Sequence, residues 1–421
     1  MKILLANYRY FISGGPERYM FNVTNQLLRH NHEVIPFSID YSQNKNTEYA
    51  GYFASPIGTR DDVYFDQHRL TPITFLKTFS RLFYSIEVKR SVSELIDDTQ
   101  PKIAYILHYL RKLSPSLLVA LKNKNIPIVV RISDYAMLCP QSHCIRDNSP
   151  CTLCVDGSII NSIRYKCVKD SRTASILNAM ATYFHNLRGY FSLIDHFVLT
   201  NTFMYNMMLE AGWPDEKLSC IPTFTDIETF CPSDNLIKNN YICYIGRIEK
   251  VKGLHILVNA FIKFKKRTPS DVILKIAGTG SEPYICDLKS IICNNNMNNS
   301  IQFVGKLNAS ELADFLRKAL FSIVPSLWFE NLPNSILESY SCGTPVIASH
   351  LGSLTACVKK GFTGDLFIPG DSDDLAHKIE FYLGNQDLLD KMAVNSREEA
   401  IQKYAPTMHL LSLEKLFNAL V

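Results

Sequence analysis

The chain has 421 residues, a formal net charge of +4 and 47% hydrophobic residues. This length suits two or three domains with full cores, and the 20% share of charged residues excludes a disordered or collagen-like chain. A charge this small, without a basic run, argues against nucleic-acid binding. The charge is uneven, because residues 1–225 carry 24 Lys and Arg against 19 Asp and Glu.

Cellular location is suggested by what the sequence does not contain. No stretch approaches the roughly 18 uninterrupted apolar residues of a membrane-spanning helix. The apolar start, Met1–Tyr8, is shorter than a signal-peptide core and is better explained as a buried strand. Twelve Cys without a secretion signal are expected to stay reduced. We therefore expect a cytoplasmic protein.

Strand-like and helix-like stretches alternate along the first half, which is typical of a parallel sheet covered by helices. A Gly14-Gly15 turn separates the first strand from a helix expected over Pro16–Arg29. Residues 139–175 interrupt this rhythm, because they are polar, irregular and rich in Cys, and we interpret them as an insertion. The expected strands are Lys2–Asn7, His32–Ser38, Ile103–Leu107, Ile126–Ile132 and His196–Thr200.

The alternation restarts after Ile221–Asp226, which has the Pro and Thr content of a linker. Strands are expected at Tyr241–Ile245, Val272–Ala277, Ile301–Phe303, Phe321–Pro325 and Pro345–Ala348, and helices at about 253–267, 281–294, 309–318 and 333–342. We predict an α/β protein with two Rossmann-like domains whose parallel sheets face each other across a cleft. The predicted domains are residues 1–225 and 226–405, and residues 406–421 form a helix that crosses back to the first domain.

Open parallel sheets bind ligands at the carboxyl ends of their strands, where loops lead into helices. Arg247 follows one strand and Lys252 precedes the next helix, so two cations and free N–H groups are placed to hold a diphosphate and stabilise it as a leaving group. The alternative is an ordinary solvated loop. Gly15 and Gly278 suit close approach of a ligand to the backbone, and Val304 ends a strand that could face a nucleobase, although plain turns look the same.

The segment Val324–Glu338 carries two acids around a strand-to-helix turn. Glu330 lies in the loop, and Glu338 lies about two turns into an otherwise apolar helix. Carboxylates accept hydrogen bonds from pairs of sugar hydroxyls, and the amides at a helix start bind another polar group. The alternative for Glu338 is a buried carboxylate with a structural partner.

These motifs, in this order, resemble the retaining nucleotide-sugar glycosyltransferases of family 4, which have the GT-B fold. The matching stretches are Gly246-Arg247 with Lys252-Gly253, Ala277–Gly280, Phe303–Gly305, Pro325-Ser326 with Glu330 and Glu338, Cys342–Ser349 and Gly364–Asp371. The N-terminal half resembles the family's acceptor domain more loosely, through Gly14-Gly15, His32–Val34 and Ile221–Phe230.

The resemblance implies roles for individual residues. Arg247 and Lys252 would bind the donor diphosphate, which Gly15 approaches from the opposite domain and Gly246 frames. Glu330 would lie beside the donor sugar and Glu338 would accept the ribose hydroxyls. The amides around Leu332, Pro333 and Asn334 would hold the sugar. His108, at the end of a strand, matches a family His at the acceptor wall; a satisfied core His is the alternative.

Two positions depart from the family pattern. Gly352-Ser353 replaces a Gly pair, and no acid follows before Val358. Ser133 stands where many relatives have the His of a His-Asp-Tyr motif, here followed by Asp134.

Five Cys lie close together within the insertion. The two-residue gap between Cys151 and Cys154 is common in structural zinc sites, and His143 is a further candidate ligand. The other spacings match no standard finger, so we predict no bound metal. The five are Cys139, Cys144, Cys151, Cys154 and Cys167.

Residues 75–90 and 176–194 combine aromatic and aliphatic side chains with basic ones. Such stretches either pack on the sheet, as every α/β domain requires, or lie on an acidic lipid surface. Packing on the sheet is the default expectation.

Together the motifs predict a retaining hexosyltransferase without cofactor or obligatory metal. It would transfer a sugar from a nucleotide-diphosphate donor to a glycan or lipid-linked glycan, in cell-surface polysaccharide biosynthesis, with peripheral contact to an acidic membrane. The alternatives are a non-catalytic sugar-nucleotide-binding subunit and a sugar-nucleotide epimerase.

Overall fold

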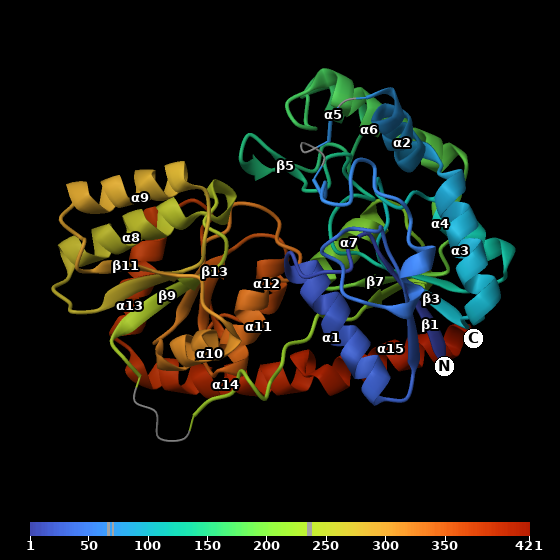
Figure 1. Cartoon of the computed structure of the whole chain (residues 1–421). Coiled ribbons are helices and arrows are strands. Elements are labelled where there is room, and N and C mark those ends of the chain that lie inside the picture. Colours follow the sequence, from blue (N-terminus) through green and yellow to red (C-terminus); the bar gives the residue numbers. More distant parts are fainter. Residues whose placement is uncertain (65–67, 70, 234–237) are drawn as a thin grey trace.

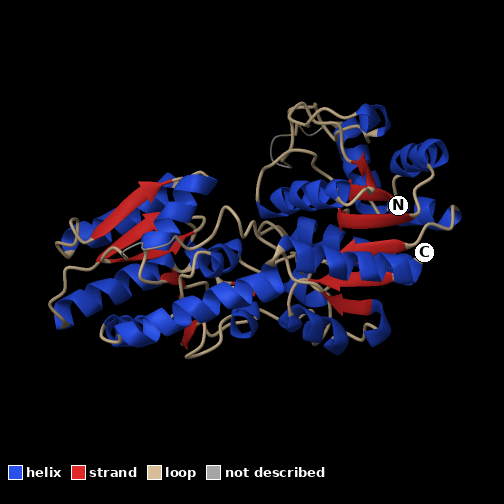
Figure 2. Ribbon diagram, turned by 90° about the horizontal axis from the view of Figure 1, so that it is seen from below, coloured by secondary structure: helices blue, strands red, loops and turns tan. Residues whose placement is uncertain are grey.

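The structure is a computed structural model that describes residues 1–64, 68–69, 71–233 and 238–421. It has two lobes, each built around one six-stranded parallel sheet (Figure 1). Helices lie on both faces of each sheet (Figure 2). The predicted α/β class with two Rossmann-like sheets is confirmed.

The N-terminal sheet has the strand order β2-β1-β3-β4-β7-β8, and Leu4 of the inner strand β1 pairs with Ile35 and Ala104. Its strands are β1 (Lys2–Asn7), β2 (Glu33–Phe37), β3 (Ile103–His108), β4 (Ile128–Arg131), β7 (His196–Leu199) and β8 (Leu218–Cys220). The edge strand β8 was not predicted, because three residues are too few to show a pattern.

The C-terminal sheet has the order β11-β10-β9-β12-β13-β14. Its strands are β9 (Tyr241–Ile245), β10 (Ile273–Ala277), β11 (Ile301–Gly305), β12 (Ser322–Val324), β13 (Val346–Ser349) and β14 (Gly364–Phe367). The five strands predicted in this half begin and end within two residues of the observed bounds. A small hairpin, β5 (Ile145–Arg146) and β6 (Ser149–Pro150), lies within the insertion.

Helices connect these strands and cover both sheets. In the N-terminal lobe they are α1 (Gly15–Arg29), α2 (Pro72–Phe83), α3 (Ile86–Thr99), α4 (Ser116–Asn123), α5 (Ile160–Arg164), α6 (Arg172–Leu187) and α7 (Thr202–Glu210). In the C-terminal lobe they are α8 (Leu254–Arg267), α9 (Glu282–Asn294), α10 (Ala309–Lys318), α11 (Asn334–Ser341), α12 (Ser353–Cys357) and α13 (Ser372–Leu383). Short 3-10 turns η1 (Glu48–Tyr52), η2 (Tyr190–Leu193), η3 (Asp215–Lys217) and η4 (Lys250–Lys252) complete the chain.

Two C-terminal helices connect the lobes. Helix α14 (Gln386–Tyr404) runs below both lobes, and α15 (Pro406–Leu420) lies on the N-terminal lobe (Figure 1). Leu413 and Phe417 of α15 join the core formed by Ile3 and Tyr105. Burial lowers the pKa of His409 in α15 to about 3, so its imidazole is neutral when it bonds to the Tyr19 hydroxyl.

Strand order also determines where the binding loops lie. In a doubly wound sheet, ligands bind where neighbouring strands continue in opposite directions from the centre. In the C-terminal sheet this point lies between β9 and β12, whose following loops carry Arg247 and Glu330. In the N-terminal sheet it lies between β1 and β3, which are followed by Gly15 and His108. The candidate residues therefore lie in equivalent loops of the two lobes, after the strands that flank the switch point of each sheet.

The expectation that the apolar faces of residues 75–90 and 176–194 pack on the sheet is wrong for much of these stretches. Ser85 breaks the first stretch by capping α3, and its hydroxyl accepts from the Val88 amide. Large apolar side chains of α2 and α6, Leu76 and Met180 among them, face solvent instead. Among the residues described, no helix is both long and apolar enough to cross a membrane.

Candidate active site

A cleft of about 370 Å³ lies between the two lobes, a size that suits a small-molecule ligand. Seven of the predicted site residues line it: Gly15, His108, Arg247, Lys252, Glu330, Leu332 and Asn334. The structure therefore brings together the predicted cations, the loop acid and the acceptor-side His from positions more than 200 residues apart in sequence.

A buried ion pair forms the C-terminal wall. The Lys252 ammonium lies 2.7 and 2.9 Å from the two carboxylate oxygens of Glu330, and the Ser326 hydroxyl donates to the same carboxylate. Burial by itself raises the pKa of Glu330, but the charge of Lys252 and these hydrogen bonds outweigh it and hold the pKa below its usual value. Glu330 is therefore an anion at neutral pH, and Lys252 faces the cleft beside it.

Arg247 is the more exposed cation of the cleft. Its side chain is 62% exposed, and its guanidinium lies 2.6 Å from the Glu249 carboxylate. A flexible, solvated pair of this kind is weak, so a more highly charged ligand can draw the guanidinium away from Glu249. Arg247 and Lys252 together offer two positive charges to one anion.

Two glycines hold this wall in shape because no side chain fits at either position. A Cβ on Gly253 would lie 1.8 Å from the Pro325 carbonyl oxygen, and its φ is +70°. A Cβ on Gly278 would lie 1.8 Å from the Gly246 carbonyl oxygen, and its φ is +147°. The backbone after β9 is thus pressed against the loops after β10 and β12, which fixes Lys252 relative to Glu330.

The start of α11 closes the cleft against the N-terminal lobe. Pro333 is the N-cap residue of this helix, and a Cβ on Gly15 would lie 3.7 Å from the Asn334 side-chain nitrogen. Because the first amides of a helix have no partner within the helix, this end offers hydrogen-bond donors to a ligand. Gly15 thus lies beside the helix start, and its approach to a donor diphosphate stays a prediction.

Glu338 is buried just over one turn into α11, and Arg18 is the charged partner found among the described residues. Its carboxylate lies 3.6 Å from the guanidinium of Arg18, which belongs to α1 of the other lobe. Burial raises the pKa of Glu338 to about 6, and Arg18 lowers it only in part. A buried carboxylate with so little compensation has free capacity to accept hydrogen bonds from a ligand.

Not all predicted residues line the cleft. Gly246, Gly278, Val304, Pro333 and Glu338 do not line it, although Pro333 and Glu338 belong to α11. Val304 lies at the end of β11 with 37% of its surface exposed.

His108 and Asp134 form a pair on the N-terminal wall. His108 Nε2 lies 3.5 Å from the Asp134 carboxylate. Burial raises the pKa of Asp134, but the hydrogen bond and charge of His108 dominate and lower it. His108 Nδ1 is buried and finds no partner among the described residues. The pair is therefore placed to bind a polar group in the cleft.

Arg131 is a third cation of the cleft and was not predicted. It is buried, stacks 3.8 Å from the centre of the Tyr19 ring, and donates to the hydroxyls of Ser133 and Thr223. Both Arg131 and Asp134 lie at or just beyond the end of β4, so the strand-end rule that identified His108 also applied to them.

The Cys-rich insertion contributes to the cleft through Ser142 and His143. The His143 ring lies 5.5 Å from that of Trp328, which in turn lies 5.2 Å from the Lys252 ammonium. The insertion therefore reaches across the cleft to the wall that carries the ion pair.

No Cys of the insertion lines the cleft. All twelve Cys of the chain are free thiols. A hydrogen bond from Cys144 lowers the pKa of Cys139 to about 6, and the same contact raises the pKa of Cys144. Within the described residues, no three His, Cys, Asp or Glu side chains are arranged to hold a metal ion. The absence of a metal stays a prediction.

Comparison with known proteins supports a glycosyltransferase architecture. Residues 229–399, less than half of the chain, match the family model "Glycosyl transferases group 1". The sucrose-phosphate synthase of Thermosynechococcus elongatus superposes with a TM-score of 0.71 at 17% identity, over 100% of this chain and 98% of that one. Anabaena Alr3699/HepE in complex with UDP-glucose superposes with a TM-score of 0.66 at 18% identity, over 99% of each chain. The chain has the GT-B fold.

Similarity to curated sequences is partial. The D-inositol 3-phosphate glycosyltransferase of Arthrobacter sp. (strain FB24) is 33% identical over 141 residues, which is 33% of each protein. The enzyme of the same name from Nocardiopsis dassonvillei is 27% identical over 206 residues, 45% of this chain and 47% of that protein. The chain thus spans less than half the length of these relatives. The predicted GT-B resemblance is confirmed, and membership of family 4 stays a prediction.

Proposed function

We propose that the protein is a retaining glycosyltransferase of family 4 that transfers a hexose from a nucleotide-diphosphate sugar to a hydroxyl of a glycan or lipid-linked glycan. One observation carries this proposal: the Lys252–Glu330 pair and Arg247 face Gly15 and His108 across a single cleft. UDP-glucose bound to the structurally similar Anabaena protein supports a nucleotide-sugar donor.

The two cations supply the electrostatic part of the mechanism. As the glycosidic bond to the diphosphate breaks, negative charge grows on the leaving group. Lys252 is held in place by Glu330 before the reaction, so its charge is oriented without further reorganisation. Arg247 joins it by exchanging Glu249 for a phosphate oxygen. Since these cations compensate the negative charge of the leaving group, we propose that no divalent metal is obligatory and that activity persists in EDTA.

A retaining outcome fits the way the acids of the cleft are used. Glu330 pairs with Lys252 and Asp134 pairs with His108, so both carboxylates that line the cleft within the described residues are engaged. Neither is free to form a covalent sugar intermediate. We propose instead that the acceptor hydroxyl attacks from the face that the diphosphate leaves, and that a phosphate oxygen takes its proton.

The acceptor would occupy the N-terminal wall. His108, Asp134 and Arg131 offer hydrogen-bonding groups there, and Tyr19 offers a ring beside them. A sugar presents hydroxyls and apolar ring faces, so it matches such a surface. We propose that the reaction belongs to cell-surface polysaccharide biosynthesis on the cytoplasmic side of the membrane.

The decisive experiment begins with a panel of nucleotide sugars tested for thermal stabilisation. A cognate donor at saturation is expected to raise the Tm by about 5 °C. Turnover is then followed with glycan acceptors, and NMR of the product gives the anomeric configuration. An inverted product would overturn the retaining mechanism.

The same experiment separates the alternatives. A binding subunit would be stabilised by the donor but would release no nucleotide under any condition. An epimerase would convert the sugar of the donor without an acceptor, which appears as a new set of donor resonances.

A further inference from the structure

Helix α6 presents its apolar side to solvent. Ile176, Met180, Tyr183 and Leu187 follow one another at helical spacing and are 37% to 70% exposed. The inner side of the same helix buries small or polar residues, Ser175 and His185 among them. A helix that only covers a sheet has the opposite arrangement, with its apolar stripe inward. Packing within the chain therefore does not explain this stripe.

Helix α2 shows the same inversion. Ile73, Phe75, Leu76 and Phe79 are 46% to 68% exposed. The helix instead buries Arg81, whose guanidinium donates to the Ser55 carbonyl oxygen and lies 3.1 Å from the Glu87 carboxylate. Arg81 and the buried Leu82 anchor α2 to the lobe, whereas the four exposed apolar side chains point away from it.

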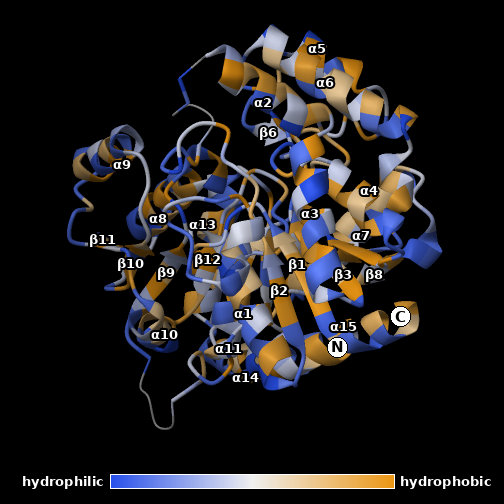
Figure 3. Ribbon diagram, turned by 45° about the vertical axis from the view of Figure 1, so that its right-hand side comes forward, coloured by the Kyte–Doolittle hydropathy of each residue, from blue (hydrophilic) through white to orange (hydrophobic). Residues whose placement is uncertain are grey.

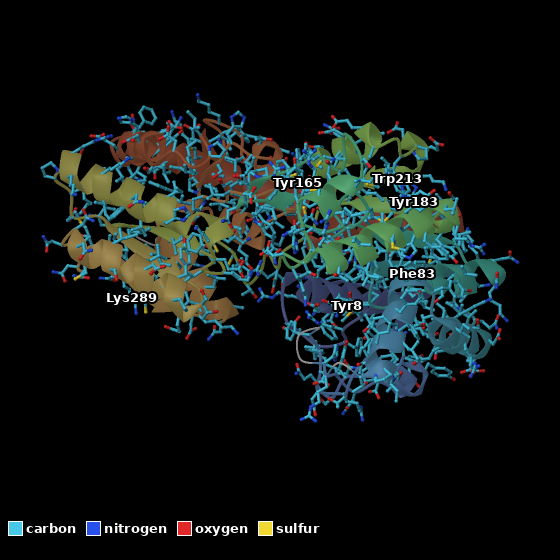
Figure 4. The ribbon with its side chains drawn as sticks, turned by 90° about the horizontal axis from the view of Figure 1, so that it is seen from above. Tyr8, Phe83, Tyr165, Tyr183, Trp213 and Lys289 are labelled. Atoms are coloured by element: carbon cyan, nitrogen blue, oxygen red, sulfur yellow. The ribbon has the colours of Figure 1, made fainter. Side chains whose placement is uncertain are left out.

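The two helices belong to one surface. Phe83 of α2 contacts Phe184 of α6 edge to face, with ring centres 5.8 Å apart. Helix α5 packs against α6 and adds the exposed Ile160. We call the solvent-facing sides of α2, α5 and α6 the outer face. Figure 3 shows hydrophobic residues along it, and Figure 4 looks down on this side of the molecule and labels Phe83 and Tyr183.

The outer face is also basic. Residues 160–188 contain five Lys and Arg but one acid, Asp170. Four of these cations are exposed and form no ion pair with any carboxylate that the structure describes: Arg164, Lys166, Arg172 and Arg188. Exposed apolar side chains flanked by unpaired cations are the pattern by which a helix lies in the interface of an anionic bilayer.

We propose that the outer face seats the N-terminal lobe on an acidic lipid bilayer. The apolar side chains would enter the region between headgroups and acyl chains, and the cations would lie at the level of the lipid phosphates. An acidic bilayer offers negative charge to all four cations at once, whereas a protein partner would need a carboxylate placed opposite each of them. The outer face is spread over three short helices, and a bilayer is broad and flat enough to contact all three.

The outer face lies close to the cleft in the chain, so contact with a bilayer would bear on how an acceptor reaches the cleft. The insertion that lines the cleft with Ser142 and His143 continues directly into α5 and α6. A bilayer against the outer face would therefore lie near the acceptor side of the cleft. If the acceptor is lipid-linked, the contact delivers it; this step rests on the proposed function, whereas the lipid contact itself does not.

The test is co-sedimentation of the full chain with vesicles. One set contains phosphatidylcholine alone, and the other contains about 30% phosphatidylglycerol, each at about 50 mM and about 500 mM salt. We expect binding to the acidic vesicles, several-fold weaker binding at high salt, and little binding to the neutral ones. Failure of the wild-type protein to bind acidic vesicles would overturn the proposal, whatever its transferase activity.

Matched variants locate the contact. Leu76→Glu with Met180→Glu places charges in the outer face and is expected to weaken binding at least about tenfold. The control is Val394→Glu with Ile401→Glu, which changes two exposed apolar residues of α14 on the opposite side of the molecule. Equal loss in both variants would contradict the assigned face. All four side chains are exposed, so the variants should melt like the wild type.

Charge variants and oligomeric state complete the test. Arg172→Glu with Arg188→Glu is expected to remove most of the salt-sensitive binding, whereas Lys360→Glu with Lys415→Glu, of equal charge, is expected to remove less. Sedimentation velocity tests the alternative that the outer face binds a second copy of the chain. A concentration-dependent dimer that Leu76→Glu with Met180→Glu dissociates, without vesicle binding, would assign the face to a second copy of the chain.

Discussion

The two walls of the cleft are constructed in different ways. The C-terminal wall is compact: the close contact of Gly253 with Pro325 joins the loops of Lys252 and Glu330, and the ion pair is formed before any ligand arrives. The N-terminal wall is assembled from the ends of separate strands and from an insertion. Its cation Arg131 is held by neutral hydroxyls.

This difference reflects what each wall has to bind. The diphosphate is the same in every nucleotide-diphosphate sugar, so one arrangement of cations and tight backbone serves all of these donors. An acceptor varies, and a wall made of separate strand ends and an insertion can change residue by residue. We therefore expect substitutions in the C-terminal wall to affect turnover generally, and those in the N-terminal wall to affect the use of particular acceptors.

The largest expected effect is on Lys252. Lys252→Ala should lower kcat by about 10² to 10³, because the charge that it stabilises grows in the transition state. Lys250 lies in the same turn, is exposed and does not line the cleft, so Lys250→Ala should remain near the wild-type rate. Steady-state kinetics of both variants is the measurement. Near-normal rates in Lys252→Ala and in Arg247→Ala would remove the diphosphate assignment.

A stability control belongs with this prediction. Removing Lys252 leaves Glu330 buried without its cation, which costs about 3 kcal/mol of folding free energy. The double variant Lys252→Ala with Glu330→Gln no longer buries a charge. It should recover much of the Tm but none of the rate, which separates loss of folding from loss of catalysis.

The next effect concerns stability of the C-terminal wall. Gly253→Ala should destabilise the protein by at least about 3 kcal/mol, because the new Cβ would overlap the Pro325 carbonyl. Gly361 has a similar φ of +72° but open space around it, so Gly361→Ala should cost only about 1 kcal/mol. Thermal unfolding of both variants separates the cost of the clash with the Pro325 carbonyl from the cost of a positive φ. Equal losses would show that the contact with Pro325 is not what holds the wall.

The same difference explains how far the sequence predicted the structure. Arg247, Lys252 and Glu330 follow strands in a fixed local pattern, so their place at one cleft followed from the strand-end rule. Arg131 and Asp134 satisfied the same rule, but a short strand followed by an irregular insertion gave no pattern to confirm them. Contacts such as that between Arg18 and Glu338 depend on how the lobes approach each other, which no local pattern encodes.

The orientation of α2 was unpredictable for a related reason. The spacing of its apolar residues shows that the helix has an apolar side, but it does not show which side packs against the lobe. The buried Arg81 pairs with the partly exposed Glu87 of the following helix, which turns the apolar side of α2 outward. An ion pair between elements thus decided the exposure of Ile73 and Leu76.

A smaller effect is expected on the N-terminal wall. His108→Ala should lower kcat/KM for the acceptor about tenfold or more, because the acceptor loses a hydrogen bond from the pair with Asp134. Hydrolysis of the donor without acceptor should change by less than about twofold, since the donor contacts are unaffected. His377→Ala, outside the cleft, is the control. Parallel losses in hydrolysis and transfer would place His108 in the donor site instead.

The smallest and most specific effect is a pH dependence of donor affinity. The raised pKa of Glu338, about 6, means that its carboxyl becomes protonated as the pH falls through this value. A protonated carboxyl accepts two hydroxyl donors less well than a carboxylate does. Donor affinity should therefore fall several-fold between about pH 7 and pH 5. Calorimetric titration of donor at several pH values measures it, and Glu338→Gln should bind weakly with little pH dependence.

Arg18 refines this last prediction, because it is the charged partner of Glu338 from the other lobe. Its side chain is 56% exposed, so the pair is strongly screened and its loss should weaken donor binding by less than about fivefold. Since Arg18 lowers the pKa of Glu338, Arg18→Ala should move the midpoint of the pH dependence upward, toward neutral pH. Arg29, at the opposite end of α1, provides a control in Arg29→Ala. A midpoint that stays in place in Arg18→Ala, or one that survives in Glu338→Gln, would assign the titration to another group.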